Sequence, residues 1–455
     1  RRQRQMCIRD RYNGPWIKEN VTHILRKDMV FLFSETNWYP ELGKAYGYRY
    51  PERKPISFFT LRAEIVSPTG MEVLTQGNLI KKKKEGNKIT TVWESTVPVS
   101  KLTLNAGIYR VISDTVDNKI VKLYYSPEHE KTILFFKGSE QVIVSLLKDV
   151  FYLIRESTGL EYPYKTLSFI ETPLQLQWYR QKGIMKNLMV PPYVVMLREE
   201  VLAASFKEIY NSVKRRAKRR NEDLTEEEMK KRVFLRFLSD KIFNKEVWNE
   251  EKFSNPVQNY WSNRVCFIGK GYPIFEFCLN DFLTDLVSSS LNRILYPERK
   301  ESEKIIGGIS LWEYERKYRI KIDTLFYVLR NIPLIEINPE KNPDLFFGAL
   351  KYKGTRIFYI LKEYIGEKNF KKVLRKFVSK RSFKESSIAD FLKTAEEITG
   401  KDLKWFSQDW IKGTSFPGYT LESIDAYKIK GCLLYTSDAA DELDGVDLVG
   451  RRIIK

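Results

Sequence analysis

The chain has 455 residues, of which 43% are hydrophobic and 14% aromatic, so it can bury more than one core. Lysine and arginine outnumber aspartate and glutamate by 78 to 58, and the formal net charge of +20 excludes an acidic, solvating protein. No uncharged apolar run reaches the length of about 18 residues that indicates a transmembrane helix. Histidine occurs only at His23 and His129, which excludes any histidine-based chemistry later in the chain.

The two ends of the chain differ in composition from the rest. Residues 1–11 are rich in arginine, and residues 431–455 lack the Lys-, Ile- and Phe-rich composition that precedes them. Both segments resemble sequencing-adapter read-through in environmental assemblies, and we predict that they are not native. A disordered basic arm and an acidic tail are the alternative. With true termini expected to be missing, the compartment is unknown and membrane association through those termini stays open.

Residues 12–135 have the pattern of a β-sandwich domain, expected to be truncated at its N-terminus. Short β-branched and aromatic runs separated by turns indicate strands at 58–66, 71–74, 88–93 and 107–113. Four lysines at 81–84, followed by Glu-Gly-Asn, predict a basic hairpin tip.

A mixed pattern begins near residue 136 and extends to about 310. Apolar residues at helical spacing predict a helix over 139–158, with Ser139 able to cap its start and Gly159 closing its end. A strand is expected at 166–170. Cys266 and Cys278 are too far apart for a CxxC motif, so no redox function or disulfide is predicted from them.

The stretch 199–253 is charge-rich and is predicted to be mainly helical. Its basic cluster at 214–220 and the acidic block at 222–228 are typical of a solvated, salt-bridged helical face. Residues 311–430 are predicted to form a helical domain, because apolar stripes recur at 357–364, 370–377 and 388–398. Ser387 with Asp390 resembles a capping box. The order of these parts predicts a multidomain α+β fold.

Four landmarks in chain order resemble the aminopeptidase N family of zinc peptidases, also called gluzincins. The first is a helix, a Tyr-Pro-Tyr-Lys turn at 162–165 and a strand within 151–173, similar to the family's helix, F/Y-P-Y-x-K turn and strand. The second, GIMKN at 183–187, is similar to the family's GxMEN motif. Tyr-Lys-Gly at 352–354 resembles Y-x-K-G, and the closing passage at 401–419 resembles GKDLxxFFxxWxxxxGxP. The resemblance extends over about 28–427.

The resemblance implies an N-terminal β-sandwich, a thermolysin-like α/β catalytic-type domain at 136–310 and a C-terminal helical domain at 311–430. It also implies that a loop binds the N-terminal end of a peptide substrate, and here that loop would consist of Gly183, Ile184, Met185, Lys186 and Asn187. Active members hold zinc through HExxH and one further carboxylate, and the motif glutamate acts as general base.

No HExxH motif occurs in this sequence. Residues 259–265 (NYWSNRV) resemble the segment that follows HExxH in the family, so the motif positions fall at 254–258. Ser254 and Gln258 then replace the two histidine ligands, and Asn255 replaces the general base. A weaker placement puts the motif at Phe237, Leu238 and Lys241, which carry no zinc ligand either.

The remaining site positions are also altered. Glu276 resembles the third zinc ligand, one residue short of the usual spacing, and Asp281 is the second candidate. A carboxylate without imidazoles does not hold zinc at trace levels, so no cofactor is expected. Lys186 replaces the amine-binding glutamate and would repel a substrate ammonium. Lys351 aligns with the transition-state tyrosine, and Tyr352 lies one residue away.

These losses predict an inactive pseudopeptidase that keeps its cleft as a docking surface for a peptide or protein. Ser254, Gln258 and Glu276 are expected at the floor of that cleft, with 183–187 on one wall and Lys351 or Tyr352 opposite. One alternative is a divergent metallo-aminopeptidase with a metal site built from Glu276, Asp281 and Glu246 or Glu250. The other is a polyanion- or membrane-surface-binding protein that uses 81–84 and 214–220. Nucleic acid is not expected as a partner, because no zinc-finger, RNP or helix-turn-helix pattern occurs.

Overall fold

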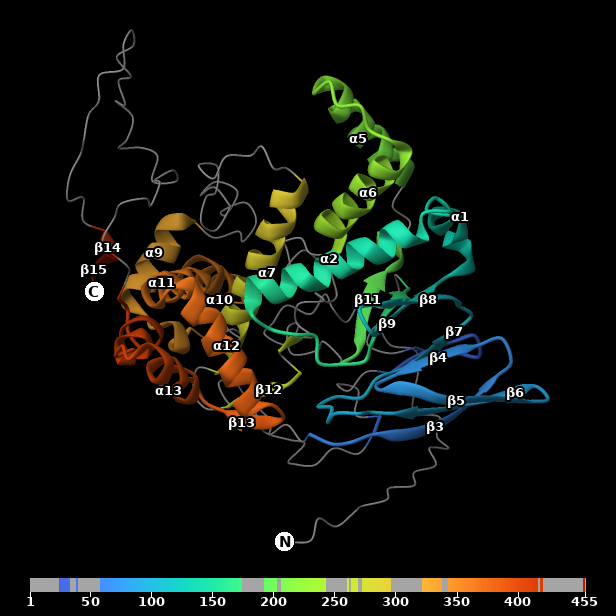
Figure 1. Ribbon diagram of the computed structural model, residues 1–455. Helices are drawn as coiled ribbons and strands as arrows, with labels where there is room; N and C mark the ends of the chain where they lie inside the picture. Colours follow the sequence, from blue (N-terminus) through green and yellow to red (C-terminus); the bar gives the residue numbers. More distant parts are fainter. Residues whose placement is uncertain are drawn as a thin grey trace.

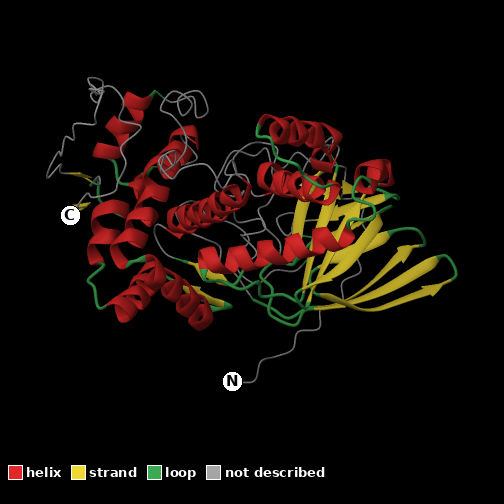
Figure 2. Ribbon diagram, turned by 45° about the horizontal axis from the view of Figure 1, so that its top comes forward, coloured by secondary structure: helices red, strands yellow, loops and turns green. Residues whose placement is uncertain are grey.

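The structure is a computed structural model (Figure 1). It describes residues 24–32, 38–39, 58–173, 192–202, 206–242, 260–261, 263–268, 272–295, 321–337, 343–415, 418–419 and 453–454. Within these residues the strands lie mostly on one side of the molecule and the helices on the other (Figure 2). The fold is therefore α+β, with β-sheets first in the chain and a helical region after them.

Two antiparallel sheets form the N-terminal part. The first has the order β1-β2-β7-β4, made of β1 (Ile24–Leu25), β2 (Met29–Leu32), β7 (Leu104–Gly107) and β4 (Glu72–Thr75). The second has the order β3-β6-β5, made of β3 (Arg62–Pro68), β6 (Lys88–Glu94) and β5 (Asn78–Glu85). Phe31 and Trp93 are fully buried there.

The strands expected at 71–74 and 88–93 are confirmed as β4 and β6. The single strand expected at 107–113 is wrong, because β7 ends at Gly107 and β8 (Arg110–Val116) begins in another sheet. A Cβ atom at Gly107 would lie 2.7 Å from the Tyr109 ring, so a side chain at this position would require the ring to move. The lysines at 81–84 lie within β5 rather than at the hairpin tip, which is formed by residues 86–87.

A third sheet is mixed and has the order β11-β10-β9-β8. Its members are β8, β9 (Lys119–Tyr125), β10 (Thr166–Thr172) and β11 (Val194–Arg198). Strand β9 is antiparallel to β8 and parallel to β10, which is parallel to β11. A parallel pair needs a crossover, supplied by η2 (Pro127–His129), α1 (Glu130–Leu134) and α2 (Glu140–Thr158). The sheet thus joins strands from both sides of residue 135.

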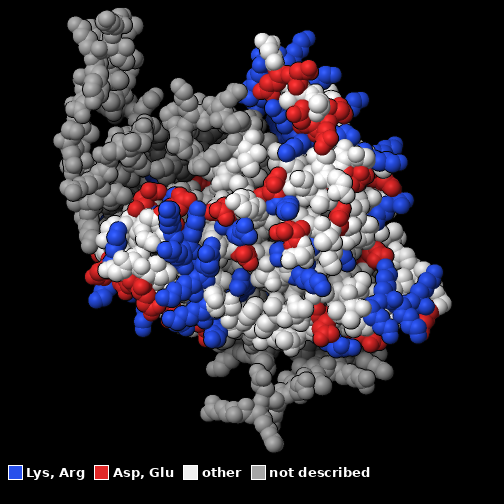
Figure 3. Space-filling model, in the orientation of Figure 1, with Lys and Arg blue, Asp and Glu red and all other residues white. Residues whose placement is uncertain are grey.

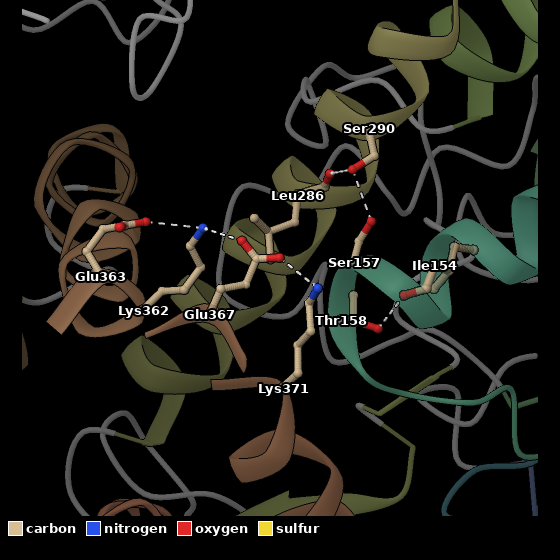
Figure 4. A network of polar contacts seen from close by, with 9 residues as sticks. All are labelled: Ile154, Ser157, Thr158, Leu286, Ser290, Lys362, Glu363, Glu367 and Lys371. Atoms are coloured by element: carbon tan, nitrogen blue, oxygen red, sulfur yellow. Dashed lines mark hydrogen bonds and ion pairs between the residues drawn. The ribbon is translucent and has the colours of Figure 1, made fainter. Parts of the chain in front are cut away.

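Helix α2 confirms the helix expected at 139–158 and connects the sheets to the helical region. Gly159 closes it in the left-handed conformation, as expected. Ser139 occupies the N-cap position, but its side chain makes no capping hydrogen bond. Helix α2 packs against α7 (Tyr272–Leu295), and the hydroxyl of Ser157 lies 3.0 Å from that of Ser290 (Figure 4).

The charge-rich segment is helical within the described residues, as predicted. It contains α4 (Glu199–Leu202), α5 (Phe206–Arg219), α6 (Glu226–Phe237) and the π-turn η4 (Leu238–Ile242). Helices α5 and α6 pack together as a hairpin that projects from the body (Figure 1). A capping box formed by Thr225 and Glu228 begins α6.

The C-terminal helices confirm the three predicted apolar stripes as α11 (Thr355–Ile365), α12 (Glu367–Arg381) and α13 (Ile388–Thr399). The predicted capping box at Ser387 and Asp390 is present. Before and after these helices the chain forms α9 (Ile322–Asn331), η7 (Leu334–Glu336), α10 (Pro343–Ala349), the π-turn η8 (Leu350–Gly354) and η9 (Phe406–Ile411). Short strand pairs are β12 (Val265–Phe267) with β13 (Lys384–Ser386) and β14 (Gly418–Tyr419) with β15 (Ile453–Ile454).

One hydrophobic cluster extends from Ile24 in β1 to Ile411 in η9. It includes residues of the N-terminal sheets, the mixed sheet and most of the helices, so the sheets and helices share a core. Among the described residues, no helix is both long and apolar enough to cross a membrane.

Candidate functional site

Helix α7 is the centre of the candidate site. Its apolar side chains are almost all buried, yet so are the carboxyl-bearing side chains of Glu276, Asp281 and Asp285. Burying a carboxylate costs several kcal/mol unless hydrogen bonds or opposite charges compensate it. The partners of these carboxylates therefore define the chemistry of the site.

Asp281 binds two donors from the segment that follows α10. The Lys351 ammonium on η8 lies 2.6 Å from Oδ1 and 2.7 Å from Oδ2 of Asp281. The Thr355 hydroxyl at the start of α11 donates to Oδ2 over 2.5 Å. The Lys351 and Asp281 side chains are only 11% and 3% exposed, so this is a buried ion pair.

Asp285 makes a second, parallel link one helical turn along. Its Oδ2 accepts a short hydrogen bond from the Tyr359 hydroxyl on α11. Burial, together with the Asp285 charge, raises the pKa of Tyr359 far above its usual value, which keeps the hydroxyl protonated as a donor. Because 281 and 285 are four residues apart, as are 351, 355 and 359, two facing rows connect α7 to η8 and α11.

Gly354 allows these rows to approach closely. A Cβ atom there would lie 2.1 Å from Sγ of Cys278 on α7, so a side chain does not fit. Its φ of −64° is ordinary helical geometry, so glycine is needed for space rather than for backbone freedom. Burial and the Asp281 charge raise the pKa of the Cys278 thiol well above its usual value. Cys278 is thus an unreactive packing residue.

Tyr352 and Lys353 have different surroundings from Lys351. The Tyr352 ring packs edge-on against Phe326 of α9, and the Arg356 guanidinium lies 4.2 Å from its centroid. The Lys353 side chain is buried, and the loss of solvation lowers its pKa to about 8. Of the two residues proposed from the sequence for the tyrosine position, Lys351 binds the Asp281 carboxylate on α7.

The Tyr-Pro-Tyr turn and the segment that resembles the one after HExxH meet beside α7. Tyr162 of the Tyr-Pro-Tyr turn packs edge-to-face with Tyr260, at a centroid distance of 5.4 Å. The neighbouring Trp261 donates its Nε1 hydrogen to Oδ1 of Asn280 on α7 over 2.6 Å. The segment predicted to follow the zinc motif therefore lies against the helix of Glu276.

Several predicted site residues lie outside the described part of the chain. These are the loop residues Gly183, Ile184, Met185, Lys186 and Asn187, the motif positions Ser254, Asn255 and Gln258, and the alternative ligands Glu246 and Glu250. Their expected convergence on a cleft stays a prediction. In the weaker placement, Phe237 and Leu238 are buried apolar residues at the junction of α6 and η4.

The described residues do not by themselves fit a metal centre. Among them, no group of three His, Cys, Asp or Glu side chains could hold one metal ion. Glu276 is 2% exposed, and Asp281, its nearest candidate companion in sequence, already binds an ammonium. Zinc would need nitrogen or sulfur ligands beside these oxygens.

His129 is the one histidine within the described residues, and it belongs to a different cluster. Its Nδ1 lies 2.7 Å from Oε1 of Glu171 at the end of β10, and the Ser126 amide donates to Oε2 of Glu171 over 2.8 Å. Burial raises the pKa of Glu171 despite these contacts. Sequence reasoning missed this pair and the Asp285–Tyr359 link, because each joins residues that are distant along the chain.

The fold and this buried polar centre define an α+β protein in which a helix bearing carboxylates packs against a lysine-containing turn. Residues 276–410 match the model of the Peptidase family M1 domain. Aminopeptidase N of Lactococcus lactis subsp. lactis is 27% identical over 89 residues, which cover 19% of this chain and 10% of that protein. Aminopeptidase A of Gloydius brevicauda is 28% identical over 107 residues, which cover 22% and 11%.

A crystal structure of Legionella pneumophila aminopeptidase A in complex with aspartic acid has a similar fold. It superposes with a TM-score of 0.51 at 16% identity and covers 88% of this chain and 39% of that one. The chain thus corresponds to a minor part of these relatives' length. Residues 276–410 are therefore similar to the M1 peptidase domain, in agreement with the resemblance to aminopeptidase N over this part of the chain.

Proposed function

We propose that this chain is a catalytically inactive M1 peptidase relative that binds a peptide or protein segment without cleaving it. The observation that carries the proposal is the buried ion pair of Lys351 with Asp281 on the same helix as Glu276. In the aminopeptidase N pattern, the position of Lys351 belongs to a tyrosine that stabilises the transition state.

An ammonium at this position acts against metal chemistry in two ways. It neutralises a carboxylate that could otherwise contribute to a cation site, and its own charge repels an approaching Zn²⁺. It also lacks the phenolic hydroxyl that the resemblance assigns to this position. The sequence adds that no histidine follows His129, so the proposed motif positions Ser254 and Gln258 offer no imidazole ligand.

The scaffold proposed for this function is the three-part arrangement expected from the sequence. It comprises an N-terminal β-sandwich at 12–135, a thermolysin-like domain at 136–310 that contains α2 and α7, and a C-terminal helical domain at 311–430. The contact of Tyr162 with Tyr260 and that of Trp261 with Asn280 support it, because they join the motif segments around α7. The occupant would be a peptide lying along the cleft bordered by 183–187.

Zinc content and hydrolysis test the loss of activity. The purified chain is loaded with Zn²⁺, freed of unbound metal, and assayed for zinc and for hydrolysis of aminoacyl arylamides with and without a chelator. We expect neither stoichiometric zinc nor chelator-sensitive hydrolysis. As a matched control, the triple variant Ser254→His/Asn255→Glu/Gln258→His restores HExxH, and we expect it to retain zinc. Stoichiometric zinc with chelator-sensitive turnover in the unmodified chain would sink the proposal.

Peptide capture tests the binding role separately. A casein digest is passed over the immobilised chain, and the eluted peptides are analysed by mass spectrometry. We expect retained peptides with intact N-termini. Peptides shortened from the N-terminus would favour the alternative, a divergent metallo-aminopeptidase whose metal site is built from Glu276, Asp281 and Glu246 or Glu250.

A further inference from the structure

Helix α12 carries a concentration of positive charge that sequence reasoning did not single out. Seven Lys or Arg and one Glu give it a formal charge of +6 over 15 residues. Four of the lysines recur at every fourth position, which places them in one line along the helix. This lysine row consists of Lys368, Lys372, Lys376 and Lys380.

The lysine row lies on the solvent side of α12. The apolar side chains of the helix, Phe370, Val373, Leu374, Phe377 and Val378, are all buried in the core. All four lysines of the row are exposed. Lys and Arg side chains gather over the region that α12 occupies in this orientation (Figure 3). With a rise of about 1.5 Å per residue, the row is roughly 18 Å long.

Neighbouring carboxylates neutralise only part of this charge. Glu367 pairs with Lys371 at 2.7 Å and with Lys362 at 3.5 Å, so it is engaged beside the row (Figure 4). Glu397 of α13 is shared by Lys376 and Lys380, at 3.2 and 3.7 Å. Within the described part of the chain, Lys368 and Lys372 form no ion pair.

The row is unfavourable for the helix itself. Like charges four residues apart destabilise a helix by about 0.2–0.5 kcal/mol for each pair. The row contains three such successive pairs, and α12 already obtains its stability from five buried apolar side chains. Folding therefore does not require these lysines, and an external anion would relieve their repulsion.

The chemistry of α12 favours one class of anion. Its aromatic side chains, Phe370 and Phe377, are buried and cannot stack on bases. A flat anionic surface requires only outward ammonium groups on an accessible helix. We propose that the lysine row docks the protein on a membrane surface by binding anionic lipid headgroups. This inference is independent of the proposed peptide binding.

Vesicle binding by the full chain tests the docking. Co-sedimentation is measured with phosphatidylcholine vesicles with and without phosphatidylglycerol, over a range of salt concentrations. We expect binding only to the anionic vesicles, weakened by salt. The variant Lys368→Gln/Lys372→Gln should weaken it about 30-fold, which corresponds to ~1 kcal/mol per lysine near the surface. Its melting temperature should not fall, because both residues lack ion pairs.

The matched control is Lys214→Gln/Lys218→Gln on α5. It removes the same charge from two exposed lysines at the same spacing in the other basic helix. We expect it to keep most of the vesicle binding. An equal loss in both variants would mean that net charge alone drives binding and would overturn the assignment to α12. Binding to duplex DNA but not to anionic vesicles at the same salt concentration would overturn the choice of lipid.

Discussion

At Asp281 a buried carboxylate accepts three hydrogen bonds from two side chains, Lys351 and Thr355. The sequence predicted that Lys351 occupies a site position, because the number of residues between it and the glycine of the Y-x-K-G-like motif can be read directly from the sequence. It did not predict the partner, which lies 70 residues earlier. A buried charge must be matched, yet which charge matches it depends on how two helices pack.

Breaking this ion pair should destabilise the fold strongly. Lys351→Met leaves the Asp281 carboxylate buried with only the Thr355 hydroxyl, and we expect unfolding in urea to show a loss of about 3–5 kcal/mol. In the double variant Lys351→Met/Asp281→Leu, no charge remains buried, and most of the loss should be recovered. A single-variant loss below about 1 kcal/mol would show that the pair is solvated rather than buried.

At the scale of elements, the packing of η8 on α7 depends on the absence of a side chain at Gly354. Gly354→Ala would normally favour a helix by about 1 kcal/mol, because alanine has the higher helix propensity. Here the new Cβ would collide with Sγ of Cys278, and we expect a net loss of about 1–3 kcal/mol in chemical denaturation.

Removing the sulfur provides the matched control. In Gly354→Ala/Cys278→Ala the new methyl group can occupy the space that the thiol leaves, so the double variant should be more stable than Gly354→Ala alone. Additive losses from the two substitutions would indicate that the contact does not limit the packing.

Most elements of the helical region were predictable, for local reasons. The Ser387–Asp390 capping box and the Gly159 helix end are properties of a few adjacent residues, and both are present. The missed details were tertiary. Ser139 stands at the N-cap of α2, but its side chain makes no capping hydrogen bond. The side chain of Glu140 accepts a hydrogen bond from the Gly138 amide over 2.9 Å instead. The sequence pattern at 107–113 predicted one strand, yet β7 and β8 are separate strands in different sheets.

At the scale of the whole molecule, sheets and helices are joined by one apolar core. The cluster extends from Ile24 to Ile411. We therefore expect a single thermal transition, in which the far-UV signal and the fluorescence of the tryptophans, Trp93 of β6 among them, change together.

A core substitution in the helical region provides the control for this expectation. Phe282 is fully buried in α7 and packs against Phe358 and Phe370. Phe282→Ala should therefore reduce the free energy of unfolding by about 3–5 kcal/mol. The midpoint temperatures of both signals should fall together. Two separate transitions, of which Phe282→Ala lowered only one, would show that the sheets and helices are separate cooperative units.

The sequence alone determined the α+β order, most helices, the aminopeptidase N resemblance and the scarcity of histidine, because these are properties of composition, periodicity and short motifs. Tertiary structure decided what no local pattern contains. It paired Lys351 with Asp281, joined Tyr162 to Tyr260, and placed four lysines of α12 in one exposed row. Charges and rings distant in sequence interact only after the core has packed, so these partners follow from the fold.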